Sequence, residues 1–175
     1  LHTTAADFLA MGFILYVVRE AKGHWQDLGL RFPEKGFWWE VLIGLGGYLA
    51  VLPVFIATLV LLVCLAHLFS YEPPPHPLVN VFLEEEERSP WLMVYSVFLA
   101  TVLGPILEEI FFRGFCYNIF KKKFGIAGGM VTTSAFFALI HESSFAFWPI
   151  FILGMGLAYV YEKRNSLLAP MVLHI

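Results

Sequence analysis

Charged side chains are scarce in this sequence of 175 residues. Asp, Glu, Lys and Arg together make up 14% of the chain, whereas 59% of it is hydrophobic. A typical soluble domain carries about 25% charged residues and about 45–50% apolar ones. The composition therefore excludes an ordinary soluble domain and predicts an integral membrane protein. We expect an all-α fold, a polytopic bundle of transmembrane helices in the lipid bilayer.

Cysteine and an excess of positive charge are also lacking. The two cysteines, Cys64 and Cys116, both fall within apolar stretches, so we expect small buried side chains rather than a disulfide framework or a CxxC redox pair. The formal net charge is -3, and the basic residues are scattered along the chain. A nucleic-acid-binding surface needs a basic patch or stripe, so we expect no nucleic acid partner.

Long apolar runs, in contrast, recur along the chain. A helix that crosses the bilayer takes about 20 predominantly apolar residues. Candidate spans are Ala5–Val18, Phe37–Phe69, Trp91–Phe120, Ile126–Ile140 and Phe145–Tyr161, and a sixth run begins at Ser166. Because Ile175 lies within that last run, we expect a fragment of about five to six spans, with further C-terminal helices missing. Residues 1–90 are expected to hold the N-terminal spans, an interfacial loop at 19–36 and an acidic, proline-rich loop at 70–90.

Lys and Arg alternate between successive loops. The first, third and fifth loops carry nine of them, whereas the second carries only Arg88 and the fourth carries none. The nine are Arg19, Lys22, Arg31, Lys35, Lys121, Lys122, Lys123, Lys163 and Arg164. By the positive-inside rule these three loops face the cytoplasm and residue 1 lies outside. The short loops and this charge pattern favour a bacterial inner membrane.

Three charged residues stand inside the apolar run Trp91–Phe120, namely Glu108, Glu109 and Arg113. Each charge near the bilayer centre costs about 2.5–3.5 kcal/mol, so each needs a partner or a function. Glu109 and Arg113 are four residues apart on one helix face and are expected to form an ion pair, which is either purely structural or a support for a site. Glu108 points about 100° away and is left unpaired by its own helix, as suits a general base. Gly104-Pro105 just upstream is expected to loosen the helix and admit water.

Two histidines are expected at a similar depth in the membrane. Counting at 1.5 Å per residue from the nearest cytoplasmic boundary puts Glu108 about 20 Å up, His141 about 22 Å and His174 about 15 Å. A carboxylate and two imidazoles at one depth suit activating water, binding a metal or passing protons. Taken singly, His141 is also typical of an interfacial residue at the end of a span.

These residues resemble the motifs of the CPBP intramembrane proteases, which include the Ras-converting CAAX prenyl endopeptidases and the Abi proteins. Glu108-Glu109-x-x-x-Arg113 resembles their EExxxR motif, and Phe137-Ala-Leu-Ile-His141 resembles FxxxH. His174 falls where the third motif, HxxxN, would begin. The resemblance extends from about Trp91 to the end, and it implies that residues 91–175 are a CPBP-like catalytic core, truncated at the C-terminus.

The resemblance implies an intramembrane endopeptidase without a cofactor, acting on a membrane-associated protein or peptide. Glu108 would activate water with the help of one histidine, and the other of His141 and His174 would stabilise the oxyanion together with an asparagine. Glu109 and Arg113 would brace the site. The asparagine expected four residues after His174 would stand beyond residue 175. No asparagine stands directly after His141 either, so that either Ser143 or Ser144 donates instead or the oxyanion site is weakened.

Three other interpretations remain open. Glu108, His141 and His174 also form the His₂Glu set that catalytic zinc uses, although Phe145 stands where an HExxH motif would need its second histidine. The departure from the family pattern after His141 is compatible with a non-catalytic membrane partner, such as a bacteriocin-immunity or scaffold protein. Buried Glu and His also serve as proton or ion relays.

Overall fold

The computed structural model describes residues 2–20, 23–31, 33, 35–72, 90–141, 143 and 145–175, and throughout these ranges every regular element is a helix. The elements are α1 (His2–Glu20), the 3-10 turn η1 (Trp25–Leu28), α2 (Phe37–Leu68), α4 (Pro90–Phe98), the π-helical turn η3 (Leu99–Leu103), α5 (Gly104–Glu109), the π-helical segment η4 (Ile110–Tyr117), α6 (Asn118–Ile140), α7 (Phe147–Arg164) and α8 (Leu168–His174). The expected all-α class is confirmed. Most of the acidic loop at 70–90, with Arg88, lies outside the described residues.

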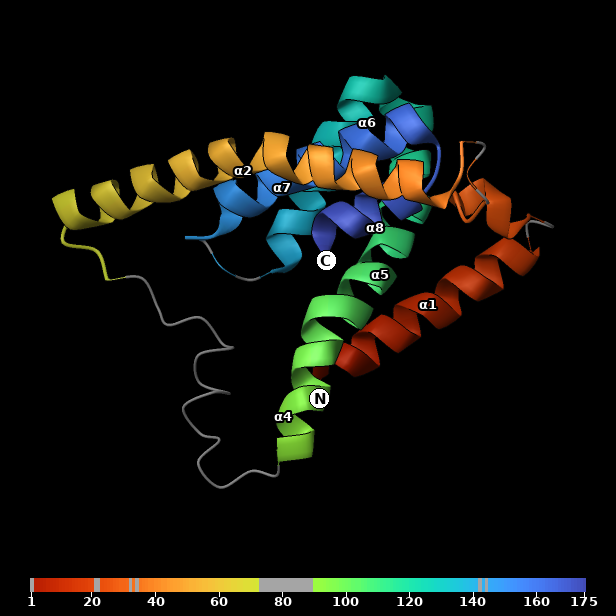
Figure 1. The fold of residues 1–175 in the computed structure, drawn as a ribbon, viewed down its shortest axis with the longest axis horizontal. Helices are drawn as coiled ribbons and strands as arrows, with labels where there is room; N and C mark the ends of the chain where they lie inside the picture. The colour runs from red at the N-terminus through yellow and green to blue at the C-terminus, as the bar shows by residue number, and fades with distance from the viewer. Residues whose placement is uncertain are drawn as a thin grey trace.

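Among the residues that the structure describes, two helical stretches are long and apolar enough to cross a membrane, Phe37–Leu68 and Met93–Ile140. α7 has 18 residues but ends in Glu162-Lys163-Arg164, which makes its last turn polar. The total of five to six spans therefore stays a prediction. Figure 1 shows the C-terminal half of α2 projecting beyond the other helices. Cys64 lies on this half and is exposed, so the expectation that both cysteines are buried holds only for Cys116.

The second apolar stretch reverses direction at Gly125. This residue has φ 73° and ψ 179°, a backbone conformation that side chains with a Cβ rarely adopt. The ring of Phe112, before the reversal, packs edge-on against the ring of Phe137, after it, with centroids 5.0 Å apart. The predicted spans Trp91–Phe120 and Ile126–Ile140 are thus two antiparallel halves of one hairpin.

Glycines let α2 lie close against α7 and α8, across which it runs in Figure 1. A Cβ on Gly44 would lie 2.6 Å from the backbone oxygen of Ala169, and one on Gly47 would lie 2.7 Å from Leu173 Cδ1. Gly46, on another face, has open space around it. Small residues at such positions are typical of tightly packed membrane helices. The close approach fixes the position of α8, which carries His174.

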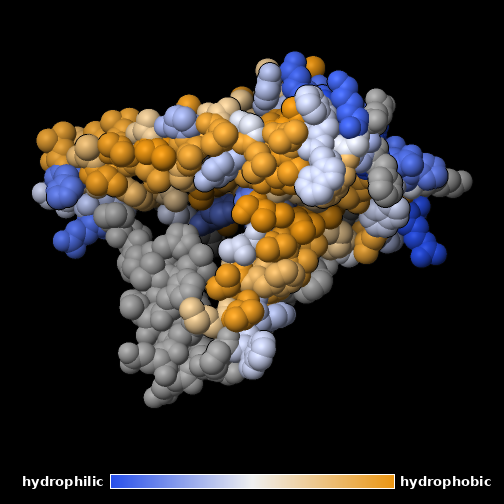
Figure 2. Space-filling view, viewed as in Figure 1, coloured by the Kyte–Doolittle hydropathy of each residue, from blue (hydrophilic) through white to orange (hydrophobic). Residues whose placement is uncertain are grey.

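The first, third and fifth loops meet at one end of the bundle. The side-chain amide of Asn118 donates to the backbone oxygen of Asp27 at 3.5 Å. The backbone N–H of Leu167 donates to the backbone oxygen of Gly29 at 3.0 Å. Leu28, within the predicted interfacial loop, is buried against this junction. Figure 2 shows hydrophilic residues gathered at the edge near the N-terminal end of α2 and apolar ones over α2 itself. The prediction that these loops share a side is confirmed, while its assignment to the cytoplasm stays a prediction.

Two ion pairs fasten this end. Buried Glu40 accepts hydrogen bonds from Arg164 Nε at 3.1 and 3.3 Å, which joins α2 to the end of α7. Glu162 accepts from Lys121 Nζ at 2.6 Å and from the Tyr117 hydroxyl at 2.8 Å. Burial by itself would raise the pKa of Glu162, but these two hydrogen bonds and the nearby lysine charges outweigh burial and lower the pKa below its ordinary value.

Candidate active site

The helix that carries the acidic pair is widened on both sides of it. The π-helical turn Leu99–Leu103 ends directly before Gly104, and the π-helical segment Ile110–Tyr117 begins directly after Glu109. Pro105 has no backbone N–H to continue an α-helical ladder, so a loosened turn at this point is expected. π-helical turns are rare and frequently occur at functional sites. The loosening predicted from Gly104-Pro105 is therefore present.

Glu109 and Arg113 form the predicted ion pair, with Arg113 Nη1 2.8 Å from Glu109 Oε1 and both side chains fully buried. Arg113 Nη2 also donates to the backbone oxygen of Gly154 on α7 at 3.3 Å. Its guanidinium carbon lies 4.5 Å from the centroid of the Phe137 ring on α6. Arg113 thus holds three helices around the buried carboxylate.

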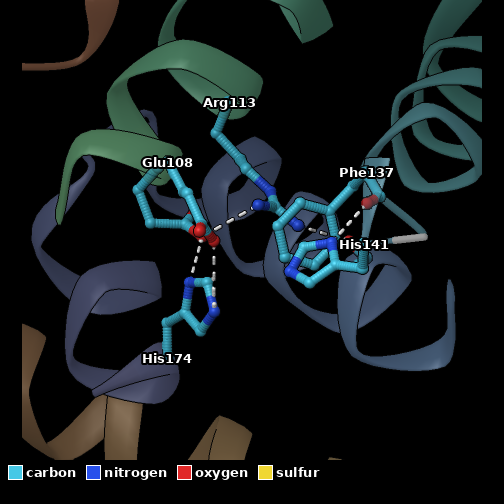
Figure 3. Close-up of polar contacts among 7 residues, drawn as sticks. Glu108, Arg113, Phe137, His141 and His174 are labelled. Carbon is cyan, nitrogen blue, oxygen red and sulfur yellow. Dashed lines mark hydrogen bonds and ion pairs between the residues drawn. The ribbon is translucent and has the colours of Figure 1, made fainter. Parts of the chain in front are cut away.

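His174 joins the two glutamates. Its Nδ1 lies 2.9 Å from Glu109 Oε1, the same oxygen that accepts from Arg113. Its Nε2 lies 3.8 Å from Glu108 Oε2 (Figure 3). The side chain of Glu108 is 26% exposed, whereas that of Glu109 is 0% exposed. Adjacent residues on one helix therefore have different environments, with one carboxylate sealed in and the other reachable.

His141 stands apart from this group. Its Nδ1 lies 2.7 Å from the backbone oxygen of Phe137, one turn back on its own helix (Figure 3). The Phe137 ring contacts both imidazoles, with centroids 4.6 Å from that of His141 and 5.7 Å from that of His174. Within the described part of the chain, no polar contact joins His141 to either glutamate. Glu108, Glu109, Arg113 and His174 are brought together, and His141 is linked to them through Phe137.

The serine donors considered in place of an asparagine are only partly described. Ser143 Oγ accepts from the backbone N–H of Ala146 at 3.2 Å, which is a local turn contact. Ser144 lies outside the described residues. The contact described for Ser143 is therefore not with the acidic pair.

As to a metal, none of the described His, Cys, Asp and Glu residues form a group of three or more arranged to hold an ion. The His₂Glu set of Glu108, His141 and His174 is accordingly not gathered, because Phe137 separates the imidazoles and His141 Nδ1 is engaged by a carbonyl. What the assembled residues offer is a reachable carboxylate beside an imidazole that a buried carboxylate orients. This arrangement suits acid–base chemistry on water.

Sequence reasoning missed two contributors to the site. Gly154 supplies the backbone oxygen for Arg113, and a Cβ on Gly154 would lie 3.0 Å from Cβ of Ser134 on α6. Phe137 was noted only as the start of a motif, but its ring contacts Arg113 and both histidines. The signal for Gly154 was available in Gly154-x-Gly156, since small residues in a span indicate a close approach of helices.

Comparisons with known proteins point to one family. Residues 90–175 match the family model of type II CAAX prenyl endopeptidases, Rce1-like. The membrane-embedded CAAX protease MroQ of Staphylococcus aureus (strain USA300) is 38% identical over 89 residues, which cover 45% of this chain and 34% of that protein. The chain thus matches about a third of the length of this relative, and no solved structure matches it. The matched residues hold the entire candidate site, and the apolar helices are those of an integral membrane protein. Through residues 90–175 this chain is thus similar to the CAAX prenyl endopeptidases.

Proposed function

We propose that this chain forms the core of an intramembrane endopeptidase in which Glu108 activates the water that hydrolyses a peptide bond. The observation that carries the proposal is His174, whose Nδ1 lies 2.9 Å from Glu109 Oε1 while its Nε2 lies 3.8 Å from Glu108 Oε2. The match of residues 90–175 to the family model supports the class of reaction, and this geometry supports the assignment of roles.

We propose that a water molecule bridges the two groups. A separation of 3.8 Å is too long for a direct hydrogen bond but is compatible with a bridging water. Glu109, ionised beside Arg113, accepts from Nδ1–H of His174 and so leaves Nε2 of the neutral ring as an acceptor. The water then donates one hydrogen to Glu108 and one to Nε2. Its remaining lone pairs are free for attack.

The reaction needs only one proton shuttle. The water oxygen bonds to the scissile carbonyl carbon as Glu108 takes a proton, and the carbonyl oxygen becomes an oxyanion. Protonated Glu108 then gives this proton to the amide nitrogen as the carbon–nitrogen bond breaks, which yields a carboxylic acid and an amine. Glu109 holds the imidazole of His174 in one tautomer, as the buried carboxylate does in a Ser-His-Asp triad.

His141 is assigned to the oxyanion. Its Nδ1 is engaged by the backbone oxygen of Phe137 at 2.7 Å, which leaves Nε2 to face a ligand. Nε2 donates a hydrogen bond to the oxyanion when the ring is an imidazolium. Such a donor stabilises the charge that develops in the transition state.

The substrate is proposed to be a membrane-associated protein or peptide of a bacterial inner membrane. The relative in Staphylococcus aureus is named a CAAX protease, so peptides that end in a CAAX sequence belong in the first substrate set. The alternation of Lys and Arg between loops supports the same membrane.

The test compares purified full-length wild type with Glu108→Gln on a quenched peptide library that includes prenylated and unprenylated CAAX peptides, with and without a strong zinc chelator. Glu20→Gln, at an exposed position on α1, is the matched control. We expect cleavage by wild type and Glu20→Gln, none by Glu108→Gln, and no effect of the chelator. Inhibition by the chelator would favour a zinc enzyme, and a wild type that cleaves nothing would favour a binding protein.

A further inference from the structure

An apolar pocket opens beside the candidate site. Its walls come from α2 (Tyr48, Val51, Leu52 and Phe55), from α7 (Leu153) and from α8 (Leu173), and its volume is about 160 Å³. The remaining lining residue is His174, the histidine that lies between the two glutamates. One imidazole thus borders both the pocket and the proposed water-activating carboxylate.

We propose that this pocket binds a single apolar side chain of the substrate, from a residue directly next to the scissile bond. The inference rests on the proposed function and adds the substrate class of that site. Because His174 lines the pocket while its Nε2 faces Glu108, a side chain seated in the pocket keeps its own backbone near the attacking water. The pocket thereby places the bond to be cut.

The volume decides which groups fit. An apolar protein cavity of about 150 Å³ holds one benzene molecule. A pocket of about 160 Å³ therefore accepts the side chain of Leu or Phe. A farnesyl chain has more than twice as many carbon atoms as benzene and exceeds this volume. The pocket selects one residue-sized apolar group, and a prenyl group on a substrate would lie elsewhere.

Most of the pocket wall comes from α2, outside residues 90–175 that match the family. Val51 lies directly against Gly156 of α7, and Gly47 lies against Leu173 of α8, so the backbones on each side of the pocket are held close together. Both contacts hold this part of α2 against α7 and α8. The N-terminal half of the chain thus sets the specificity of a site whose reacting groups lie in the other half.

The first test changes the size of the pocket. Leu52→Phe fills the pocket, and Phe55→Ala enlarges it. The control is Leu49→Phe, which also replaces Leu by Phe on α2 but at an exposed position. Each full-length variant is assayed on a peptide that wild type cleaves, with Ala, Leu, Phe or Trp placed in turn on each side of the scissile bond.

We expect wild type and Leu49→Phe to prefer Leu or Phe over Ala by about tenfold or more in kcat/KM. Leu52→Phe should shift the preference to Ala, and Phe55→Ala should shift it to Trp. Such reversals keep one good substrate for each variant, so they also show that the variants fold. Ratios that stay at their wild-type values in both pocket variants would overturn the proposal.

The second test does not need turnover. Wild type, Glu108→Gln, Leu52→Phe and Leu49→Phe are labelled with the photoreactive probe N-acetyl-photoleucine amide or with a diazirine-bearing fatty acid, and the labelled peptides are mapped. We expect photoleucine on residues 48–55 or on Leu153 in every protein except Leu52→Phe. Labelling there without any cleavage would retain the pocket and reject the proposed function. Labelling by the fatty acid alone would identify a lipid site and reject the pocket proposal.

Discussion

Substitutions at Glu109 and Arg113 allow the effect of the buried ion pair on stability to be measured apart from its effect on catalysis. Glu109→Leu leaves Arg113 without its carboxylate, and Arg113→Met leaves Glu109 without its guanidinium. Both side chains are fully buried, and Arg113 Nη1 lies 2.8 Å from Glu109 Oε1. Breaking such a pair from one side costs about 3–5 kcal/mol, because a charge remains buried without compensation.

The double variant Glu109→Leu/Arg113→Met removes both charges. Replacing a whole buried pair by apolar groups is often neutral or stabilising. We therefore expect the double variant to have nearly the wild-type free energy of unfolding. Its loss of stability should be far smaller than the sum of the losses in the two single variants. Activity should fall about a hundredfold or more in Glu109→Leu and in the double variant, because Glu109 no longer fixes the His174 tautomer.

The measurement is denaturant unfolding of the full-length protein in micelles, followed by tryptophan fluorescence, with peptide cleavage measured on the same samples. Glu20→Gln serves as the surface control. Single variants within about 0.5 kcal/mol of wild type would refute the reasoning, since that is the range of ordinary surface substitutions. A double variant as unstable as the sum of the two singles would refute it too.

Two further changes test the packing and the charges around the site. Gly44→Ala would put a Cβ 2.6 Å from the backbone oxygen of Ala169 and so displace α8, and we therefore expect loss of cleavage. The control is Gly46→Ala, which lies in open space. It should retain cleavage and match or exceed the stability of the wild type. The lowered pKa of Glu162 stabilises the fold above the unfolded pKa of about 4.3 and loses this effect as pH falls through the folded value. The difference in unfolding free energy between wild type and Glu162→Gln should therefore be largest near pH 6 and shrink as the carboxylate is protonated in acid; a difference that does not change with pH would contradict this.

The sequence was sufficient for the features that depend on local spacing. Apolar runs separated by polar residues predicted the helices, and the four-residue spacing of Glu109 and Arg113 predicted their ion pair. The alternation of Lys and Arg predicted that the first, third and fifth loops share one end of the bundle. Each of these follows from helix geometry or from the cost of charge in lipid, so neighbours along the chain carry the information.

Features that depend on how helices meet could not be read in the same way. Counting residues put His141 and His174 at similar depths, but depth leaves the direction of each side chain open. In the structure His174 reaches Glu109, while His141 turns to the carbonyl of Phe137. The π-helical turns around the acidic pair rotate the side chains away from an ideal α-helix, and only their cause, Gly104-Pro105, was visible in the sequence.

The dependence of the site on α2 follows from the same packing. α2 contributes no group to the proposed reaction, yet Gly44 and Gly47 are what allow α8 to approach it. α8 in turn carries His174, and the distance from His174 Nε2 to Glu108 Oε2 decides whether one water fits between them. An alanine at Gly44 would therefore act on cleavage through a chain of contacts, without touching any reacting atom. The part of the chain outside the family match thus packs against the helix that carries His174 and forms most of the pocket wall.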